Sequence, residues 1–126
     1  MNKWLLDTNA LIWFFTGSSR MEKVLDLLNL PDTKVYISTV SYWEIAIKIK
    51  AGKLPIDIMQ LISFADEYNF IELPLSKSHI RVYLDLPILH KDPFDHMLLA
   101  QAIESPMRLI TGDAILADYS SLVMLV

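Results

Sequence analysis

The feature that most limits the fold is the alternation of two kinds of segment along the 126 residues. Short apolar runs rich in branched or aromatic residues and bounded by turn formers are typical of strands buried on both faces. Between them, apolar residues recur with the 3.6-residue period of a helix. This alternation predicts an α/β fold, with helices covering a central parallel sheet of about five strands. The expected strands are 3–7, 34–38, 69–73, 108–111 and 122–126, and the expected helices are 21–30, 40–51, 56–68, 77–84 and 94–104.

Length and composition favour one folding unit over residues 1–126, because 53% of the residues are hydrophobic and 21% are charged. The apolar run at 4–6 is followed at once by Asp7 and Asn9, which excludes a membrane span and a signal peptide there. We therefore expect a soluble, cytoplasmic protein with no membrane partner. Because the chain has no cysteine, a bound metal ion would need oxygen or imidazole ligands.

The formal net charge of -4 argues against a protein that grips nucleic acid by a strongly basic face. The net charge alone does not exclude nucleic-acid binding, however. If divalent cations engaged four carboxylates, the remaining charges would sum to zero, and a local basic patch could still meet a phosphate backbone.

Four acidic residues are expected at one edge of the sheet, since the functional crevice of an open α/β sheet lies beyond the carboxyl ends of its strands. Asp7 closes the first strand and Asp113 follows the fourth. Glu44 opens the helix after the second strand, and Asp95 opens the helix that precedes the fourth. The sequence therefore predicts that these four side chains share a site.

Two of these acids also have a purely structural interpretation near the N-terminal strands. Asp7 could simply end its strand, with Thr8 or Asn9 capping a short helix. However, an acid directly after three buried apolar residues is costly unless something binds it. Ser41 followed three residues later by Glu44 matches a capping box, so capping and metal binding both stay open for Glu44.

The segment DPFD at 92–95 combines a cap with a candidate ligand. Asp92 before Pro93 is typical of an N-cap followed by proline at the first helical position. Asp95 then occupies the third position, where the helix dipole favours a carboxylate, and its side chain leans back toward the strand edge. Asp113 could be a plain turn residue, although Thr111 adds a hydroxyl on the same edge.

Four carboxylates brought close together require compensation of their negative charge. At an effective dielectric near 20, two carboxylates about 5 Å apart repel by roughly 3 kcal/mol, and all pairs among four would cost on the order of 20 kcal/mol. Protons or cations must neutralise such a cluster, and an all-oxygen site suits Mg2+ or Mn2+ at neutral pH. These ions activate a hydroxide and stabilise an in-line phosphoryl displacement, which is the chemistry of a nuclease.

The segments LLDTNALIW, SYWEIAIK, DPFDHMLLAQA and ITGDAIL resemble the motifs of the PIN-domain family, especially the VapC-like toxins of type II toxin-antitoxin systems. The likeness spans nearly the whole chain. It implies a three-layer α/β/α sandwich and a Mg2+- or Mn2+-dependent endoribonuclease toxin acting on RNA, with an antitoxin protein as partner and commonly a homodimer. Carried over by position, the catalytic and metal-binding acids are Asp7, Glu44, Asp95 and Asp113, with Asn9 and Thr111 in supporting places.

One position departs from the family pattern. Relatives often carry an arginine directly after the third acid, where this chain has His96. A neutral imidazole there would weaken contact with RNA, and its titration at about pH 6.5 would make activity depend on pH. A role for His96 as a metal ligand stays open, although a lone exposed histidine seldom has that role, and His96 is a candidate RNA contact.

Four lysines are the remaining candidates for contact with the phosphate backbone. Because residues two apart on a helix point in different directions, part of this charge is expected only to aid solubility. The candidates are Lys48, Lys50, Lys53 and Lys91.

The segment ALIWFFTG at 10–17 is apolar almost all round. Two interpretations stay open from sequence. Either the segment belongs to the core, or some of Trp13, Phe14 and Phe15 form a patch for an antitoxin or a second protomer.

Three other functions fit the sequence less well than a nuclease does. A phosphatase of the haloacid-dehalogenase kind also uses an Asp after its first strand, but it requires a second Asp where this chain has Asn9. A phosphoacceptor receiver domain requires a lysine at the end of its last strand, and nothing after Arg108 is basic. A catalytically idle domain that binds only RNA or protein is disfavoured because all four acids are present.

Overall fold

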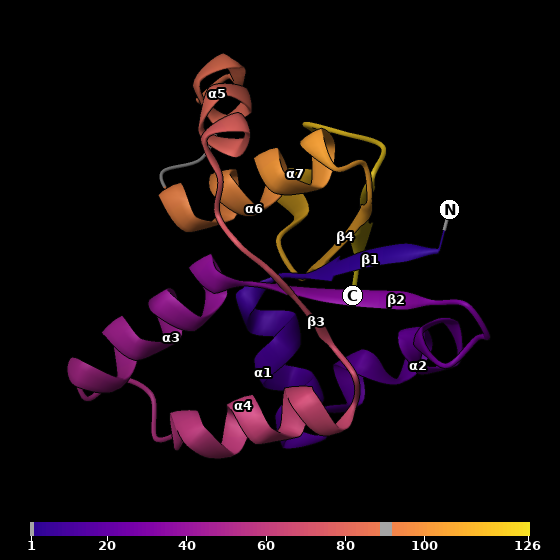
Figure 1. Ribbon diagram of the computed structural model, residues 1–126, viewed down its shortest axis with the longest axis vertical. Coiled ribbons are helices and arrows are strands. Elements are labelled where there is room, and N and C mark those ends of the chain that lie inside the picture. The colour runs from indigo at the N-terminus through magenta and orange to yellow at the C-terminus, as the bar shows by residue number, and fades with distance from the viewer. Residues whose placement is uncertain (1, 89–91) are drawn as a thin grey trace.

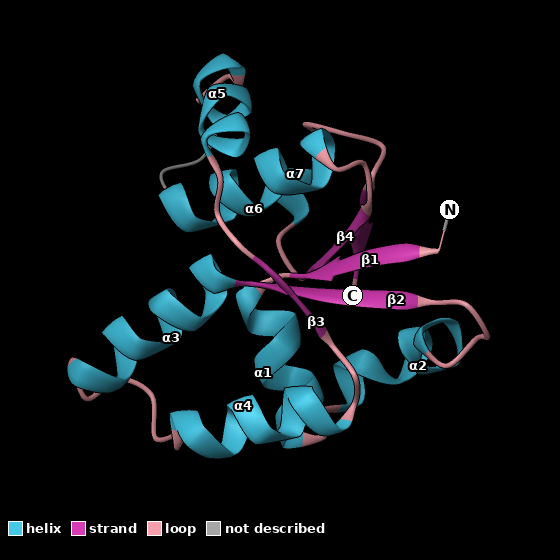
Figure 2. Cartoon of the chain, in the orientation of Figure 1, coloured by secondary structure: helices cyan, strands magenta, loops and turns pink. Residues whose placement is uncertain are grey.

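The computed structural model describes residues 2–88 and 92–126, and its centre is a five-stranded sheet in which all neighbouring strands pair in parallel (Figures 1 and 2). The strand order is β3-β2-β1-β4-β5. This confirms the predicted parallel sheet. The strands are β1 (Lys3–Leu6), β2 (Lys34–Ser38), β3 (Ile71–Leu73), β4 (Arg108–Thr111) and β5 (Val123–Leu125).

The five predicted helices are present, with ends that differ from the predictions by at most two residues. A further helix follows β1, another follows β4, and a short 3-10 turn precedes α2. Within the described ranges, no helix has the length and apolar character needed to cross a membrane. The helical segments are α1 (Thr8–Thr16), η1 (Ser19–Met21), α2 (Glu22–Leu28), α3 (Thr39–Lys50), α4 (Ile58–Glu67), α5 (Lys77–Asp85), α6 (Pro93–Glu104) and α7 (Ala114–Ala117).

The helices cover both faces of the sheet, and β1 shows why. Successive residues of a strand point to opposite faces. Leu6 belongs to a buried cluster with Leu11 of α1, whereas Leu5 belongs to a second cluster with Leu98 of α6. In Figure 1, α1, α2 and α4 lie on one side of the strands, and α6 and α7 lie on the other. The protein therefore has the predicted three-layer α/β/α architecture.

The expectation that every strand is buried on both faces is wrong for β3 and β5. Ile71 in β3 is 38% exposed, and Leu125 in β5 is 41% exposed. Each strand lies at an edge of the sheet and pairs with only one neighbour. Apolar content alone does not reveal which strands occupy the edges.

The aromatic side chains of α1 are half-buried and pack against the core. The Phe14 ring lies 5.6 Å from Phe64, 5.2 Å from Tyr68 and 5.5 Å from Phe70, centroid to centroid. Such tilted and edge-on contacts stabilise a cluster beyond simple burial. Packing between α1 and α4 therefore accounts for much of the apolar surface of α1.

Gly112, in the turn between β4 and α7, is required by a close approach of α1. A Cβ at this position would overlap the Trp13 ring and lie 2.9 Å from its Cζ3. The ring cannot retreat easily, because the Arg20 guanidinium lies 4.1 Å from its centroid. The indole of Trp13 thus fixes the turn that leads into Asp113.

We predict that Gly112→Ala lowers the free energy of unfolding by about 1–3 kcal/mol, because an overpacked site must shift its neighbours. Urea unfolding monitored by circular dichroism measures the change. In a Trp13→Leu background the same substitution should cost clearly less, since the overlapping ring is gone. An equal cost in both backgrounds would show that the Trp13 contact is not the reason for glycine.

A candidate metal centre at the carboxyl edge of the sheet

Asp7 directly follows β1, and Asp113 follows β4 after Gly112; the two strands pair side by side. The Asp7 N–H donates to the Ile110 carbonyl at 3.0 Å, which continues the pairing to the edge. Both acids are also helix N-caps. Asp7 Oδ1 accepts from the Ala10 N–H at 2.7 Å, and Asp113 Oδ1 accepts from the Ile115 N–H at 2.9 Å. Asp7 itself, and neither Thr8 nor Asn9, therefore caps α1.

Thr111 joins these two acids. Its side chain is fully buried, its hydroxyl oxygen accepts from the Asp113 N–H at 3.1 Å, and it also hydrogen-bonds to the Asp7 side chain. Thr111 therefore links the turn that carries Asp113 to the acid that follows β1.

Glu44 reaches the same edge from the second turn of α3. The capping-box interpretation is wrong, because α3 begins at Thr39 and its N-cap is Ser38, whose Oγ accepts from the Val40 N–H at 3.0 Å. Ser41 lies inside the helix. Glu44 is buried, and its Oε1 accepts a hydrogen bond from the Thr8 hydroxyl at 2.6 Å. Its orientation therefore depends on α1 rather than on a cap.

Asp95 lies in the first turn of α6, as predicted. Asp92 is the N-cap, and its Oδ1 accepts from the backbone N–H groups of Phe94 and Asp95 at 2.9 and 3.3 Å. Pro93 occupies the first helical position. The predicted roles of Asp92 and Pro93 as helix-start residues are confirmed.

Shifted pKa values show that the four acids influence one another. Burial, with a further contribution from nearby negative charge, raises the pKa of Asp95 to about 8. Burial also raises the pKa of Asp7 to about 6, although hydrogen bonds from Thr111 and Ala10 oppose the shift. The charges that raise the pKa of Asp95 further belong to Asp92, Asp7, Glu44 and Asp113.

Whether these residues fit a metal ion is decided by their chemistry and electrostatics. Across residues 2–88 and 92–126, no three histidine, aspartate or glutamate side chains stand in an arrangement ready to hold an ion. The donor set nevertheless consists of carboxylate oxygens, which Mg2+ and Mn2+ prefer. Burial first, and neighbouring carboxylates second, raise the pKa values of Asp7 and Asp95, so further positive charge at this edge would favour their ionised forms. A divalent cation would supply that charge, so the residues fit one after local rearrangement.

His96 differs from expectation. It is buried, and its Nε2 lies 2.9 Å from the Tyr119 hydroxyl. Its ring also packs near Tyr83 and Tyr119, at centroid distances of 6.2 and 5.4 Å. The side of α6 that carries His96 faces these rings, so His96 is not the exposed RNA contact that we expected.

The other predicted residues are less closely connected with the acids. Asn9, Lys50 and Lys53 are exposed, and Lys91 lies outside the described residues. Lys48 is the exception, because its Nζ lies 2.9 Å from Glu44 Oε2. Sequence reasoning placed Lys48 in a groove and missed this pair, although the i,i+4 spacing of Glu44 and Lys48 was a usable signal.

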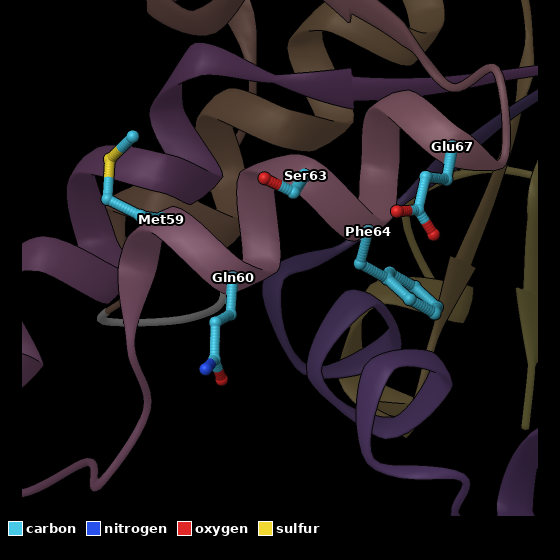
Figure 3. A pocket seen from close by; sticks show the side chains of 5 residues that line it. All are labelled: Met59, Gln60, Ser63, Phe64 and Glu67. Carbon is cyan, nitrogen blue, oxygen red and sulfur yellow. The ribbon is translucent and has the colours of Figure 1, made fainter.

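The acids do not line the hollow drawn in Figure 3, which lies on α4 and has a volume of about 360 Å³. Phe64, one of its lining residues (Figure 3), makes a tilted contact with Phe14 and an edge-on contact with Phe15 of α1. The hollow therefore lies on α4, whereas the acids with raised pKa values lie at the edge of the sheet. Buried acids with raised pKa values cluster at functional sites, so the sheet edge rather than this hollow is the candidate site. The hollow is lined by Met59, Gln60, Ser63, Phe64 and Glu67.

The fold and this edge define a class: parallel α/β domains with buried carboxylates at the ends of their central strands. The model of the PIN-domain family matches residues 4–122, and the chain belongs to that family. This confirms the resemblance inferred from the four motifs. No curated protein sequence matches the chain.

Three solved structures share the fold at low sequence identity. A VapBC2 complex from Rickettsia felis, bound to a DNA fragment from its promoter, has a TM-score of 0.72 and 17% identity over 98% of this chain and 97% of the other. A toxin-antitoxin complex from Klebsiella pneumoniae has a TM-score of 0.69 and 22% identity over 95% and 94%. The VapBC-5 toxin-antitoxin structure from Mycobacterium tuberculosis has a TM-score of 0.67 and 20% identity over 100% and 98%.

The raised pKa of Asp95 predicts how stability depends on pH without metal. Its ordinary value is 3.8, so between about pH 4 and pH 8 the folded state binds more protons than the unfolded state. Stability is therefore lost as pH rises through this window. Asp95→Asn should raise the melting temperature by roughly 2–5 °C at about pH 8 in chelator, and should have little effect below about pH 4.5.

Asp26→Asn is the matched control, because it removes the same charge from an exposed position on α2. It should leave the melting temperature nearly unchanged at both pH values. An Asp95→Asn protein that is equally stabilised at both pH values would show that ionisation of Asp95 is not the cause.

Proposed function

We propose that this protein is a Mg2+- or Mn2+-dependent endoribonuclease and the toxin of a toxin-antitoxin pair, acting in the cytoplasm. The observation that carries this proposal is the electrostatic coupling of four acids at the carboxyl edge of a PIN-domain sheet. The similar folds in VapBC and other toxin-antitoxin complexes support the toxin role.

In this proposal the metal ligands, and the catalytic residues, are Asp7, Glu44, Asp95 and Asp113. When bound, a divalent ion activates a water molecule and stabilises the oxygens of an in-line displacement at phosphorus. Other side chains hold the acids in place.

Those other side chains act through contacts that are already present. Thr111 orients Asp7, Thr8 orients Glu44, and the Asp92 cap fixes the first turn of α6. These contacts are already made in the metal-free protein, and they restrict how far Asp7, Glu44 and the start of α6 can move. The side chains proposed to meet the RNA backbone or support the site from outside are Asn9, Lys50, Lys53 and Lys91.

We also propose two protein partners, an antitoxin and a second copy of this chain. An apolar hollow of about 220 Å³ where α3, α5 and α6 meet supports a protein interface. Trp43 on its rim is 62% exposed and makes an edge-on contact with Phe94 at 5.3 Å. Large exposed aromatic side chains of this kind often anchor protein interfaces. Val40, Trp43, Leu75, Tyr83, Pro93, Phe94 and Met97 line it.

The main alternative is an idle PIN domain that binds RNA or protein without cleaving it. Burial of Asp7 and Glu44 weighs against it, because a domain without chemistry gains nothing from the cost of burying these charges. A haloacid-dehalogenase phosphatase is disfavoured further, since Asn9 is exposed and cannot ionise.

We predict that the purified chain cleaves single-stranded or looped RNA only with Mg2+ or Mn2+, and that Asp95→Asn lowers the rate by roughly 100-fold or more because an ion ligand is lost. Gel analysis of a defined RNA pool measures the rate, and circular dichroism checks the fold. Asp26→Asn should cleave at the wild-type rate. Undiminished cleavage by Asp95→Asn would remove Asp95 from the mechanism, whereas no cleavage of any RNA would favour the idle domain.

Expression in a bacterial host tests the toxin role separately. We expect the wild-type chain to arrest growth, Asp95→Asn to leave growth unaffected, and co-expression of the neighbouring reading frame to restore it. Colony counts after induction measure these outcomes. Normal growth with an active ribonuclease would indicate a housekeeping nuclease instead.

A further inference from the structure

Both oxygens of the Glu44 carboxylate are already engaged. Oε1 accepts from the Thr8 hydroxyl at 2.6 Å, and Oε2 pairs with Lys48 Nζ at 2.9 Å. The Thr8 hydroxyl has one proton, and the shorter contact to a charged acceptor takes it, although Ser41 Oγ also lies 3.1 Å away. Glu44 is therefore held from two elements, α1 and its own helix.

The pair between Glu44 and Lys48 is not an ordinary surface ion pair. Exposed pairs at i,i+4 contribute little, because water screens them and both side chains lose entropy. Here the Glu44 side chain is only 7% exposed, whereas Lys48 is 41% exposed. The lysine brings its charge to a buried carboxylate along a flexible stem that still reaches solvent.

We propose that Lys48 is the resident counter-ion of the acid cluster and competes with a divalent cation for the Glu44 carboxylate. This inference rests on the proposed function, because it takes Glu44 as a metal ligand. In the metal-free protein, Lys48 offsets the charge that Glu44 brings to the edge. When an ion binds, Lys48 leaves Oε2 and turns to solvent, while Thr8 keeps Glu44 in position through Oε1.

The competition follows from charge and from geometry. Lys48 Nζ lies 2.9 Å from Oε2, and a cation bound to the same carboxylate oxygen would repel it. Lys48 is thus a positioning residue. Lys48 stabilises the acid cluster when no ion is bound, and it lowers the affinity of the site for the ion.

Isothermal titration of the full-length, metal-free protein with Mn2+ tests the proposal. Lys48→Met should bind Mn2+ about tenfold more tightly than the wild type, because a repelling charge is removed next to the site. Lys48→Arg should restore a dissociation constant near the wild-type value. Lys50→Met is the matched control, since it removes the same charge from an exposed position on the same helix and should change affinity less than about twofold.

Every outcome is decisive. An unchanged or weaker Mn2+ affinity in folded Lys48→Met would overturn the counter-ion role while leaving the metal site intact. Equal tightening in Lys48→Met and Lys50→Met would show a general charge effect and would also overturn it. If the wild-type protein itself takes up no Mn2+, the proposed metal dependence fails together with the role of Lys48.

Discussion

Repulsion among carboxylates at one edge of a parallel sheet is the constraint on which the rest of this structure depends. Because β1 and β4 pair in parallel, Asp7 and Asp113 emerge side by side, and only a different topology would separate them. Burial and neighbouring charge keep the pKa values of Asp7 and Asp95 high. The buried hydroxyl of Thr111 eases part of the cost at Asp7, and Lys48 pairs with Glu44, the acid that α3 brings to the edge.

Local pattern predicted most of the fold. Apolar runs and helical periodicity placed five strands and five helices with only small errors at their ends, because both signals are carried by neighbouring residues. The pattern failed where position in the sheet matters. An apolar strand looks the same at an edge as at the centre, so β3 and β5 were expected to be buried. The helix α7 has four residues, which is too short to show a period.

In the candidate site, too, local pattern predicted some features and missed those that depend on the tertiary structure. Asp7 and Asp113 were predicted from the simple rule that parallel strands end at one edge, and Asp92 with Pro93 from the chemistry of a helix start. The error at Glu44 concerns where α3 begins, whereas its actual partner and the partner of His96 lie in distant segments. The Thr8 to Glu44 hydrogen bond spans 36 residues and the His96 to Tyr119 contact spans 23, and no local pattern encodes either.

The most direct test of the central claim is a crystal structure of the chain grown with Mn2+, with the ion located by its anomalous scattering. The account predicts a peak at the carboxyl edge of the sheet, within coordination distance of carboxylate oxygens from at least two of Asp7, Glu44, Asp95 and Asp113. A peak elsewhere on the surface, or none at saturating Mn2+, would contradict the claim that these acids are gathered to hold a divalent ion.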